Sequence, residues 1–272
     1  MCVSLKQAKE LETVVEKTGR VFVLTHNYTG YPMVKQARHA VQAGELGRIN
    51  KVVVEYPQGW LAGLLTDPDS GLGGWRRNPD TAGSSCCIAD IGIHAENLCR
   101  YVTGLEIEEL CADVSSFIGP GRLDDDASVL LRFKGGARGV LMASQVSTGE
   151  ENDLRIRVYG DRAGLSWSQE NPNYLEMKDP SGSVRRLSRG NPGLCEEARK
   201  ACRLPPGHPE GFIEAFANIY LEAFRSIRGF EEGRPAALHD HPTVKDGVAG
   251  NAFIETVLES GKSEKKWVKM KI

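Results

Sequence analysis

The sequence places a carboxylate and an imidazole four residues apart, at Asp90 and His94. On a helix this spacing puts both side chains on one face. A carboxylate beside an imidazole orients the ring and raises its basicity, so that the ring takes a hydroxyl proton while hydride leaves the adjacent carbon. Spacing alone favours a simpler interpretation, in which His94 is a structural histidine near the start of a capped helix.

A second group of candidate residues follows a short apolar run at 21–24. The run lacks alternation, which is typical of a strand buried on both faces in a parallel sheet. Ligands of open α/β sheets bind beyond the carboxyl ends of such strands, so His26, Asn27 and Tyr28 are candidates for ligand contacts. A turn that forms hydrogen bonds only with itself would explain the same residues.

Two loop positions are also candidates. Arg76, next to Trp75, carries a fixed fork of donors that suits a phosphate or a polar substrate. The alternative is a solvated loop arginine anchored by Trp75. His208 would line a substrate pocket ahead of a helix, unless Pro209 and Glu210 simply start that helix.

Motifs that bind nucleotides are missing from these 272 residues. Dinucleotide sites use Gly-x-Gly-x-x-Gly between a strand and a helix, where the backbone approaches the pyrophosphate. The nearest string, at 71–76, has Arg76 in place of the third glycine and no preceding strand. No Gly-x-x-x-x-Gly-Lys-Ser/Thr string occurs either.

Metal-binding patterns are weak in this sequence. The string His-Asp-His at 239–241 lacks a third ligand nearby, and the adjacent Cys86 and Cys87 would rarely present both sulfurs to one ion. The seven cysteines are irregularly spaced, which indicates reduced thiols rather than a disulfide framework. The three aspartates at 124–126 predict a solvated turn.

The elements that must position these residues follow from hydrophobic periodicity. Helical spacing between Ser4 and Gly19 predicts a first helix. From residue 107 the period changes to two and tight turns recur, which predicts an antiparallel sheet. Further helices are expected at 32–43, 88–102, 211–228 and 243–260. Strands are expected at 49–56, 107–117, 127–133, 137–146, 154–159, 165–169, 174–178 and 184–188, with an edge strand at 266–272.

Composition excludes some classes of function. The net charge of −2 argues against a nucleic-acid partner, which would require a basic face. No run of about 18 apolar residues is present, so we expect no membrane span. The N-terminus lacks the apolar centre of a secretory signal, and we expect a cytoplasmic protein.

Several strings of this sequence resemble the Gfo/Idh/MocA oxidoreductase family and keep its order of elements. They are His-Asn-Tyr-Thr-Gly-Tyr-Pro at 26–32, Gly-Trp-Arg at 74–76, Asp-Ile-Gly-Ile-His at 90–94, Ala-Ser-Gln at 143–145, Arg-Val-Tyr-Gly at 157–160 and Gly-His-Pro-Glu-Gly at 207–211. The Asp-x-x-x-His pair is the most specific of these strings, and together they span nearly the whole chain.

The resemblance implies an oxidoreductase that uses NAD or NADP on a sugar, a polyol or a related compound. It implies His94 as the general acid/base, with Asp90 as its partner or as a substrate contact. The other expected contacts are divided between cofactor and substrate. They are Trp75, Arg76, His26 and Asn27 for the cofactor, and Tyr28, Asn97 and His208 for the substrate.

The resemblance also implies the domain organisation and an α/β (α+β) fold. Residues 1–25 would be a remnant of an N-terminal Rossmann domain. Residues 26–272 would form a C-terminal substrate and oligomerisation domain, built on a large open, mainly antiparallel sheet with helices on one face. Such sheets mediate oligomers in this family, so we expect a homo-oligomer.

The family's catalytic lysine is expected in a Glu-Lys-Pro motif just before the first helix. Only Met1, Cys2 and Val3 precede that helix here, and Lys6 and Lys9 lie inside it. We therefore expect an N-terminally truncated chain, natural or due to a misassigned gene start. Weak cofactor binding and little activity of the chain alone would follow.

Two other functions remain open at this point. The chain would be a non-enzymatic sugar-binding or oligomerisation module if ligand binding did not depend on His94. It would be a metal-dependent lyase or isomerase if Asp90 and His94 held an ion with a further ligand. The sequence identifies neither the substrate nor the choice between NAD and NADP.

Overall fold

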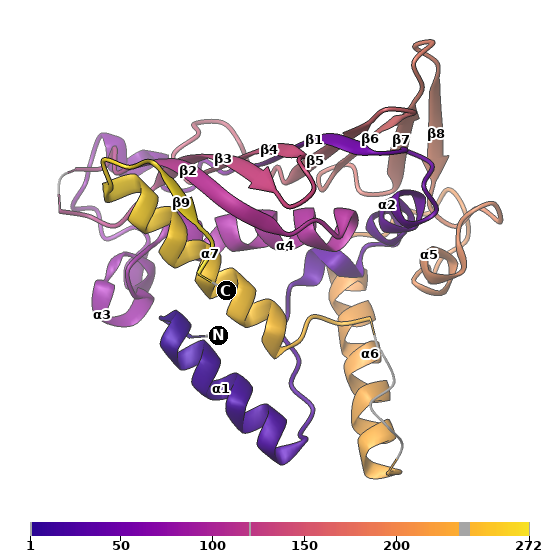
Figure 1. Cartoon of the computed structure of the whole chain (residues 1–272), viewed down its shortest axis with the longest axis horizontal. Helices are drawn as coiled ribbons and strands as arrows, with labels where there is room; N and C mark the ends of the chain where they lie inside the picture. The colour runs from indigo at the N-terminus through magenta and orange to yellow at the C-terminus, as the bar shows by residue number, and fades with distance from the viewer. Residues whose placement is uncertain (1, 120, 234–239, 272) are drawn as a thin grey trace.

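The computed structural model describes residues 2–119, 121–233 and 240–271. A nine-stranded sheet forms one layer, and the helices lie below it (Figure 1). The strand order is β8-β7-β6-β5-β1-β4-β3-β2-β9. The strands are β1 (Ile49–Pro57), β2 (Ile107–Ser115), β3 (Asp126–Phe133), β4 (Arg138–Ser144), β5 (Arg155–Gly160), β6 (Gly164–Ser168), β7 (Tyr174–Lys178), β8 (Val184–Ser188) and β9 (Trp267–Lys269).

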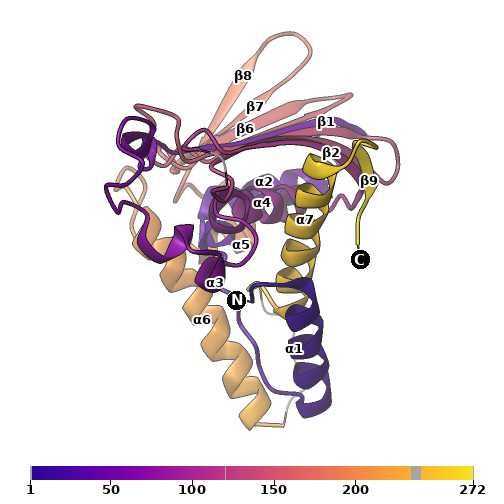
Figure 2. The same ribbon diagram turned by 90° about the vertical axis from the view of Figure 1, so that its left-hand side faces the viewer.

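The sheet is mixed but mostly antiparallel. Strands β1 and β4 are parallel, and the other neighbouring pairs are antiparallel. Figure 2 shows the helices of the described residues on one face of the sheet and none of them on the other. The predicted α/β fold with an open, mainly antiparallel sheet is thereby confirmed, including the edge strand β9, which pairs with β2.

The helices form a layer under the sheet and two projecting arms. Helices α2, α4 and α7 lie against the sheet, whereas α1 and α6 extend away from it (Figure 2). The helices are α1 (Leu5–Thr18), α2 (Pro32–Gln42), α3 (Pro79–Ala82), α4 (Ile93–Thr103), α5 (Glu196–Lys200), α6 (Phe212–Glu231) and α7 (Val244–Lys262). Single turns are η1 (Asn27–Gly30), η2 (Ala62–Leu65), η3 (Gly74–Arg77) and η4 (Ile88–Gly92).

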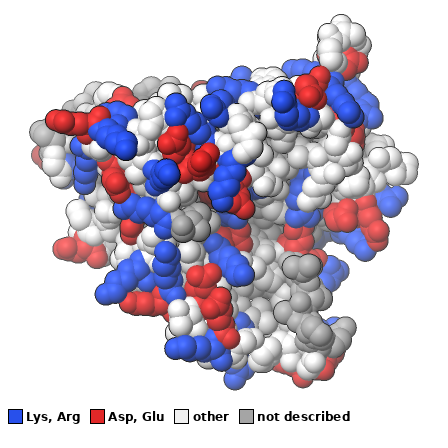
Figure 3. Space-filling model, viewed as in Figure 1, with Lys and Arg blue, Asp and Glu red and all other residues white. Residues whose placement is uncertain are grey.

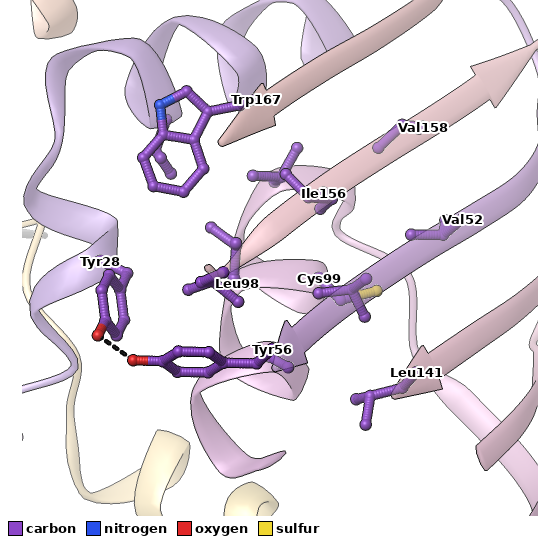
Figure 4. Close-up of a cluster of buried hydrophobic side chains, with 14 of the residues drawn as sticks. Tyr28, Val52, Tyr56, Leu98, Cys99, Leu141, Ile156, Val158 and Trp167 are labelled. Atoms are coloured by element: carbon purple, nitrogen blue, oxygen red, sulfur yellow. Dashed lines mark hydrogen bonds between the residues drawn. The ribbon is translucent and has the colours of Figure 1, made fainter. Parts of the chain in front are cut away.

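The main core lies between the sheet and helices α2 and α4. Side chains on alternate residues of β1 and β5, such as Val52 and Ile156, are fully buried there. They pack with Leu98 and Cys99 of α4 (Figure 4). The apolar face of the strands and the apolar face of the helix bury each other, and this burial stabilises both elements.

The segment 21–24 departs from the prediction. It was expected to form a buried strand, but it is a half-buried coil. Its Leu24 N–H donates to the Pro242 carbonyl at 2.9 Å, and no described strand runs beside it. An apolar run becomes a strand only where neighbouring strands supply the ladder, and the described sheet does not extend to this segment.

The turn at 124–126 also departs from the prediction of solvated carboxylates. Asp124 and Asp125 are buried. The Asp124 carboxylate accepts hydrogen bonds from the Cys86 and Ile88 N–H groups, at 2.9 and 2.8 Å. The Asp125 carboxylate accepts from two backbone N–H groups of the 117–118 loop. Buried carboxylates are tolerated here because each one satisfies backbone donors.

Charges of both signs are interspersed over the face seen in Figure 3. None of the described helices is long and apolar enough to cross a membrane. The mixture of charges agrees with the small net charge of −2.

The anchoring role of Asp124 gives a first testable prediction. Asp124→Ala leaves the Cys86 and Ile88 N–H groups buried without acceptors, so we expect it to lower the free energy of unfolding by about 3 kcal/mol. Asp69→Ala is the control, because this carboxylate is 90% exposed and should change stability by less than about 0.5 kcal/mol. Urea denaturation followed by circular dichroism measures both changes. Equal losses in the two variants would contradict the anchoring role.

Candidate functional site

The parallel pair of strands places the candidate site. Tyr56 and Pro57 at the end of β1 lie opposite Ala143 and Ser144 at the end of β4. The carboxyl ends of these two strands therefore lie side by side, and Gln145 follows directly. In open α/β sheets this edge is where ligands bind.

The predicted helix at 88–102 begins with a different kind of turn. Residues 88–92 form the π-helical turn η4, and α4 starts only at Ile93, whose N–H donates to the Ile88 carbonyl. A Cβ at Gly92 would lie 2.8 Å from the end of the Ile88 side chain, so the glycine leaves room for that side chain. Single π-turns inside helices frequently occur at functional sites. Asp90 lies in this turn, and His94 lies in the first turn of α4.

The Asp90 carboxylate is held by side chains from two other segments. Gln145 donates from Nε2 to Oδ2 at 2.8 Å, and Arg76 donates from Nε to Oδ1 at 3.2 Å. The Asp90 side chain is 30% exposed, so it remains accessible to a ligand. Gln145 therefore links the end of β4 to the π-turn, and it fixes the carboxylate from the protein side.

Arg76 lies beside this carboxylate, and Trp75 packs against Arg76. The Arg76 guanidinium lies 4.7 Å from the centre of the Trp75 ring and 5.8 Å from that of Trp60. These rings and Asp90 restrict the guanidinium to one region. Trp75 itself is largely exposed and offers a free aromatic face.

His94 contacts a second histidine. Its Nδ1 lies 3.1 Å from Nδ1 of His26, and the two rings meet edge to face. Tyr28 also meets the His94 ring at right angles, with a centroid distance of 5.2 Å. The hydrogen bonds of Asp90 go to Arg76 and Gln145, so the ring of His94 is oriented by His26 and Tyr28 rather than by a direct bond to Asp90.

The charge state of His94 follows from its surroundings. Burial lowers the pKa of His94 to about 4, although the nearby Asp90 carboxylate acts in the opposite direction. Burial also lowers the pKa of His26, and the neighbouring His94 adds to this effect. Both rings are therefore neutral at pH 7, and a neutral imidazole has one nitrogen free to accept a proton.

The histidine pair allows two arrangements of protons. Only one of the two Nδ1 atoms carries a hydrogen in the Nδ1–Nδ1 bond. If His94 donates, its Nε2 is a bare base. If His26 donates, the Nε2 of His94 already carries a proton and cannot accept another one. The partner histidine therefore sets whether the Nε2 of His94 is ready to accept a proton.

Buried tyrosines form the wall behind this pair. The hydroxyls of Tyr28 and Tyr56 form a hydrogen bond (Figure 4), and Tyr56 donates to Asn152 Oδ1 at 2.8 Å. Burial raises the pKa of both tyrosines, so they remain protonated. Tyr28, expected at the substrate, is only 5% exposed. Its ring therefore acts on His94 as a packing surface.

Helix α6 holds η1, the turn that carries Tyr28. Asn218 donates from Nδ2 to the Gly30 carbonyl at 2.9 Å. Gly30 has no side chain, and a Cβ there would overlap the Ala215 backbone. The close approach of α6 to η1 therefore requires glycine at this position.

Two buried polar atoms near His94 lack partners among the described residues. They are Nε2 of His26 and Nδ2 of Asn27. Unpaired buried polar atoms are costly and often mark a site that a ligand completes. Asn97, one turn after His94 on α4, is buried as well.

His208 lies apart from this cluster. Its side chain is exposed and lines a separate hollow of about 270 Å³ with Asn173, Tyr174 and Arg189. The residues of that hollow do not include any partner of His94 or Asp90. The buried ion pair between Arg189 and Glu210, at 2.7 Å, holds this loop in place.

The sequence did not single out several residues that shape the site. Gln145, Tyr56, Asn152 and Trp60 all reach it from segments distant in sequence. Gln145 lies in the Ala-Ser-Gln string, which contributed to the family resemblance but did not indicate a function for Gln145. Asp90 and His94 belong to no set of three metal-binding side chains within the described ranges, and His239 lies outside them.

Comparisons with known proteins agree on one family. A model of the GFO/IDH/MocA C-terminal domain matches residues 34–166. An inositol dehydrogenase homolog from Azotobacter vinelandii, solved in complex with NAD⁺, is 31% identical with a TM-score of 0.93, and the match covers 98% of this chain and 70% of that one. An oxidoreductase from Sinorhizobium meliloti is 41% identical with a TM-score of 0.84, over 98% of this chain and 69% of that one. Levoglucosan dehydrogenase from Pseudarthrobacter phenanthrenivorans is 25% identical, over 97% of this chain and 70% of its own length.

The lowered pKa of His94 predicts how stability depends on pH. Between pH 6.5 and about 4 the unfolded chain protonates this ring and the folded chain does not, so stability falls as the pH is lowered. Each unit of pKa difference corresponds to at most about 1.4 kcal/mol. We expect His94→Gln to reduce this pH dependence, measured by urea denaturation from pH 7 to pH 4. His208→Gln is the matched control, and an equal reduction in both variants would contradict the assignment.

Proposed function

The chain belongs to the Gfo/Idh/MocA oxidoreductase family, and from this premise we propose that it transfers hydride between a nicotinamide cofactor and a sugar or polyol. The observation that carries the proposal is the neutral imidazole of His94, next to the fixed carboxylate of Asp90, at the carboxyl ends of the parallel strands. Such a pair can move the hydroxyl proton that alcohol oxidation releases.

The relatives support the substrate class. The Azotobacter homolog has also been solved with NADH and myo-inositol, and levoglucosan dehydrogenase is named for an anhydrosugar. Both are compounds rich in hydroxyl groups. The half-exposed Asp90 and Arg76 of this chain are an acceptor and a donor that suit neighbouring hydroxyls.

The residues of the site also fit a nicotinamide. The unpaired Nδ2 of Asn27 is a donor for an amide carbonyl, and the exposed face of Trp75 can pack against a planar ring. We propose that His26 and Arg76 complete this side of the site. The bound cofactor would supply the hydride acceptor or donor.

His94 is proposed as the general acid/base. During oxidation its Nε2 accepts the hydroxyl proton, which requires His94 to donate from Nδ1 to His26. During reduction the same step runs in reverse: His94, protonated on both nitrogens, donates its Nε2 proton to the carbonyl oxygen and returns to the neutral ring. Asp90 stabilises the positive charge that appears on His94 when it takes the proton, because their interaction favours the charged ring.

The alternatives from the sequence are not favoured by these comparisons. The similar proteins carry names of oxidoreductases, and none of the names points to a lyase or a non-enzymatic module. We further propose that the 272 residues bind the cofactor weakly by themselves, because they contain no glycine-rich pyrophosphate loop. The choice between NAD and NADP stays open.

The proposed acid/base role predicts the effect of His94→Asn. The variant keeps a polar side chain but removes the proton acceptor, so we expect kcat for polyol oxidation to fall by about 10²- to 10⁴-fold. The assay follows NADH absorbance with myo-inositol or levoglucosan and millimolar NAD⁺, which compensates for weak cofactor binding. The control His208→Asn lies outside the cluster and should retain activity. Equal rates for His94→Asn and the parent would refute the proposal.

His26 is tested in the same assay as a positioning residue. His26→Phe preserves the ring volume but removes the Nδ1 partner of His94, so we expect kcat to fall with little change in KM. His26→Asn keeps an amide oxygen that can accept a hydrogen bond from Nδ1 of His94, so we expect this variant to retain more activity than His26→Phe. Equal kcat values in the two variants would indicate that His26 only fills space.

We also propose that the uncovered face of the sheet forms a homo-oligomer. Leu130 and Tyr159 are 48% and 42% exposed on this face, which no helix covers (Figure 2). Exposed apolar side chains on an uncovered sheet face would be buried by a partner that packs on that face.

The oligomer proposal predicts a concentration-dependent mass in sedimentation equilibrium. The double variant Leu130→Lys/Tyr159→Lys should be monomeric, because two charges would be buried against the partner. Phe224→Lys, at a more exposed apolar position on α6, is the control. Loss of the oligomer in the control alone would place the interface elsewhere.

A further inference from the structure

Three side chains with metal-binding atoms meet where α5 packs against α2. They are His39, in the last turn of α2, and Cys195 and Glu197, at the start of α5. One nitrogen, sulfur or oxygen atom from each lies within 4.8 Å of the other two. No other set of three histidine, cysteine or acidic side chains comes this close within residues 2–119, 121–233 and 240–271. Figure 1 shows α5 beside α2 near the β8 edge of the molecule.

The backbone around the cysteine is fixed by α2. The buried Gln36 accepts a hydrogen bond from the Cys195 N–H at 2.7 Å. Gln36 and His39 are three residues apart on α2, so they lie on the same face of that helix. The Ala198 N–H donates to the cysteine sulfur at 3.4 Å. The same helix face that anchors the cysteine therefore carries the imidazole.

The neighbouring cations are already paired with other carboxylates. Lys35 and Arg38 both bind Asp240, at 2.5 and 2.7 Å. Lys200 binds Glu196 at 2.6 Å. In the part of the chain that the structure describes, Glu197 forms no ion pair with a cationic side chain, so its carboxylate can serve a metal ion.

We propose that His39, Cys195 and Glu197 bind a zinc ion that ties α5 to α2. Thiolate, imidazole and carboxylate are the ligands that zinc takes in proteins, at about 2.0–2.3 Å. The thiolate disfavours magnesium and calcium, which prefer oxygen ligands. His39 and Glu197 are exposed, so small rotations bring their atoms to the spacing of a tetrahedral site. A water molecule takes the fourth position.

Binding requires the cysteine to lose its proton to solvent. Burial raises the pKa of the Cys195 thiol, so without metal the sulfur is protonated at neutral pH. Zinc replaces this proton and forms the bond to sulfur. Because the ligands come from two separate segments, binding should stabilise the folded chain.

Cobalt substitution tests this site without any assay of activity. Co²⁺ added to the reduced chain should bind one equivalent and produce the intense absorption of a cobalt–thiolate bond, and Zn²⁺ should abolish it by competition. Cys195→Ser should lose this absorption. Cys202→Ser, which changes a half-buried cysteine of the same segment, should keep it.

The other two ligands make the test independent of the cysteine variant. His39→Gln and Glu197→Gln change exposed side chains, so both should fold, and each should weaken binding by at least about a hundredfold. Zinc should also raise the melting temperature of the parent chain but not of these variants. Cobalt–thiolate absorption that persists in Cys195→Ser, or equal metal affinity in the parent and both glutamine variants, would overturn the proposal.

Discussion

The parallel pairing of β1 and β4 is the constraint on which the candidate site depends. In a sheet whose other neighbouring pairs are antiparallel, this one pair brings two strand ends to the same edge. A parallel connection must cross over the sheet, and here the crossover carries η4 and α4 across its helical face. Asp90 therefore arrives at the end of β4, where Gln145 binds it. An antiparallel pair joined by a hairpin would leave no crossover to carry the catalytic candidates.

Desolvation decides the chemistry of His94. A carboxylate nearby would by itself make the imidazole a stronger base, as the sequence suggested. Burial outweighs this effect, so the ring stays neutral and takes a proton only when the substrate offers one. Asp90 contributes chiefly through charge, since its hydrogen bonds are used by Arg76 and Gln145. The proton position is instead set by His26, a neutral partner that can either donate or accept.

The sequence predicts the elements better than it predicts the site. Period-two alternation placed each strand from β2 to β8 to within about two residues, because one face of each strand must be buried. The π-turn η4 was missed, since its residues have the same apolar spacing as an ordinary helix. The His26–His94 contact and the burial of Asp124 arise only when distant segments meet. Their donors and acceptors are visible in the sequence, but their partners are not.

Helix α2 connects two different kinds of site in the proposed arrangement. It starts directly after η1, whose Tyr28 packs on His94, and its last turn carries His39. Contact with the same helix does not by itself couple the metal site to the His94 site. A rigid helix transmits a change between two sites only if it has two stable positions. Its buried residues fix α2 against the sheet core, and this favours one position. An ion at its far end would therefore add stability to the α5 segment and leave the acid/base pair unchanged, which separates the role of the metal from the chemistry of the sugar site.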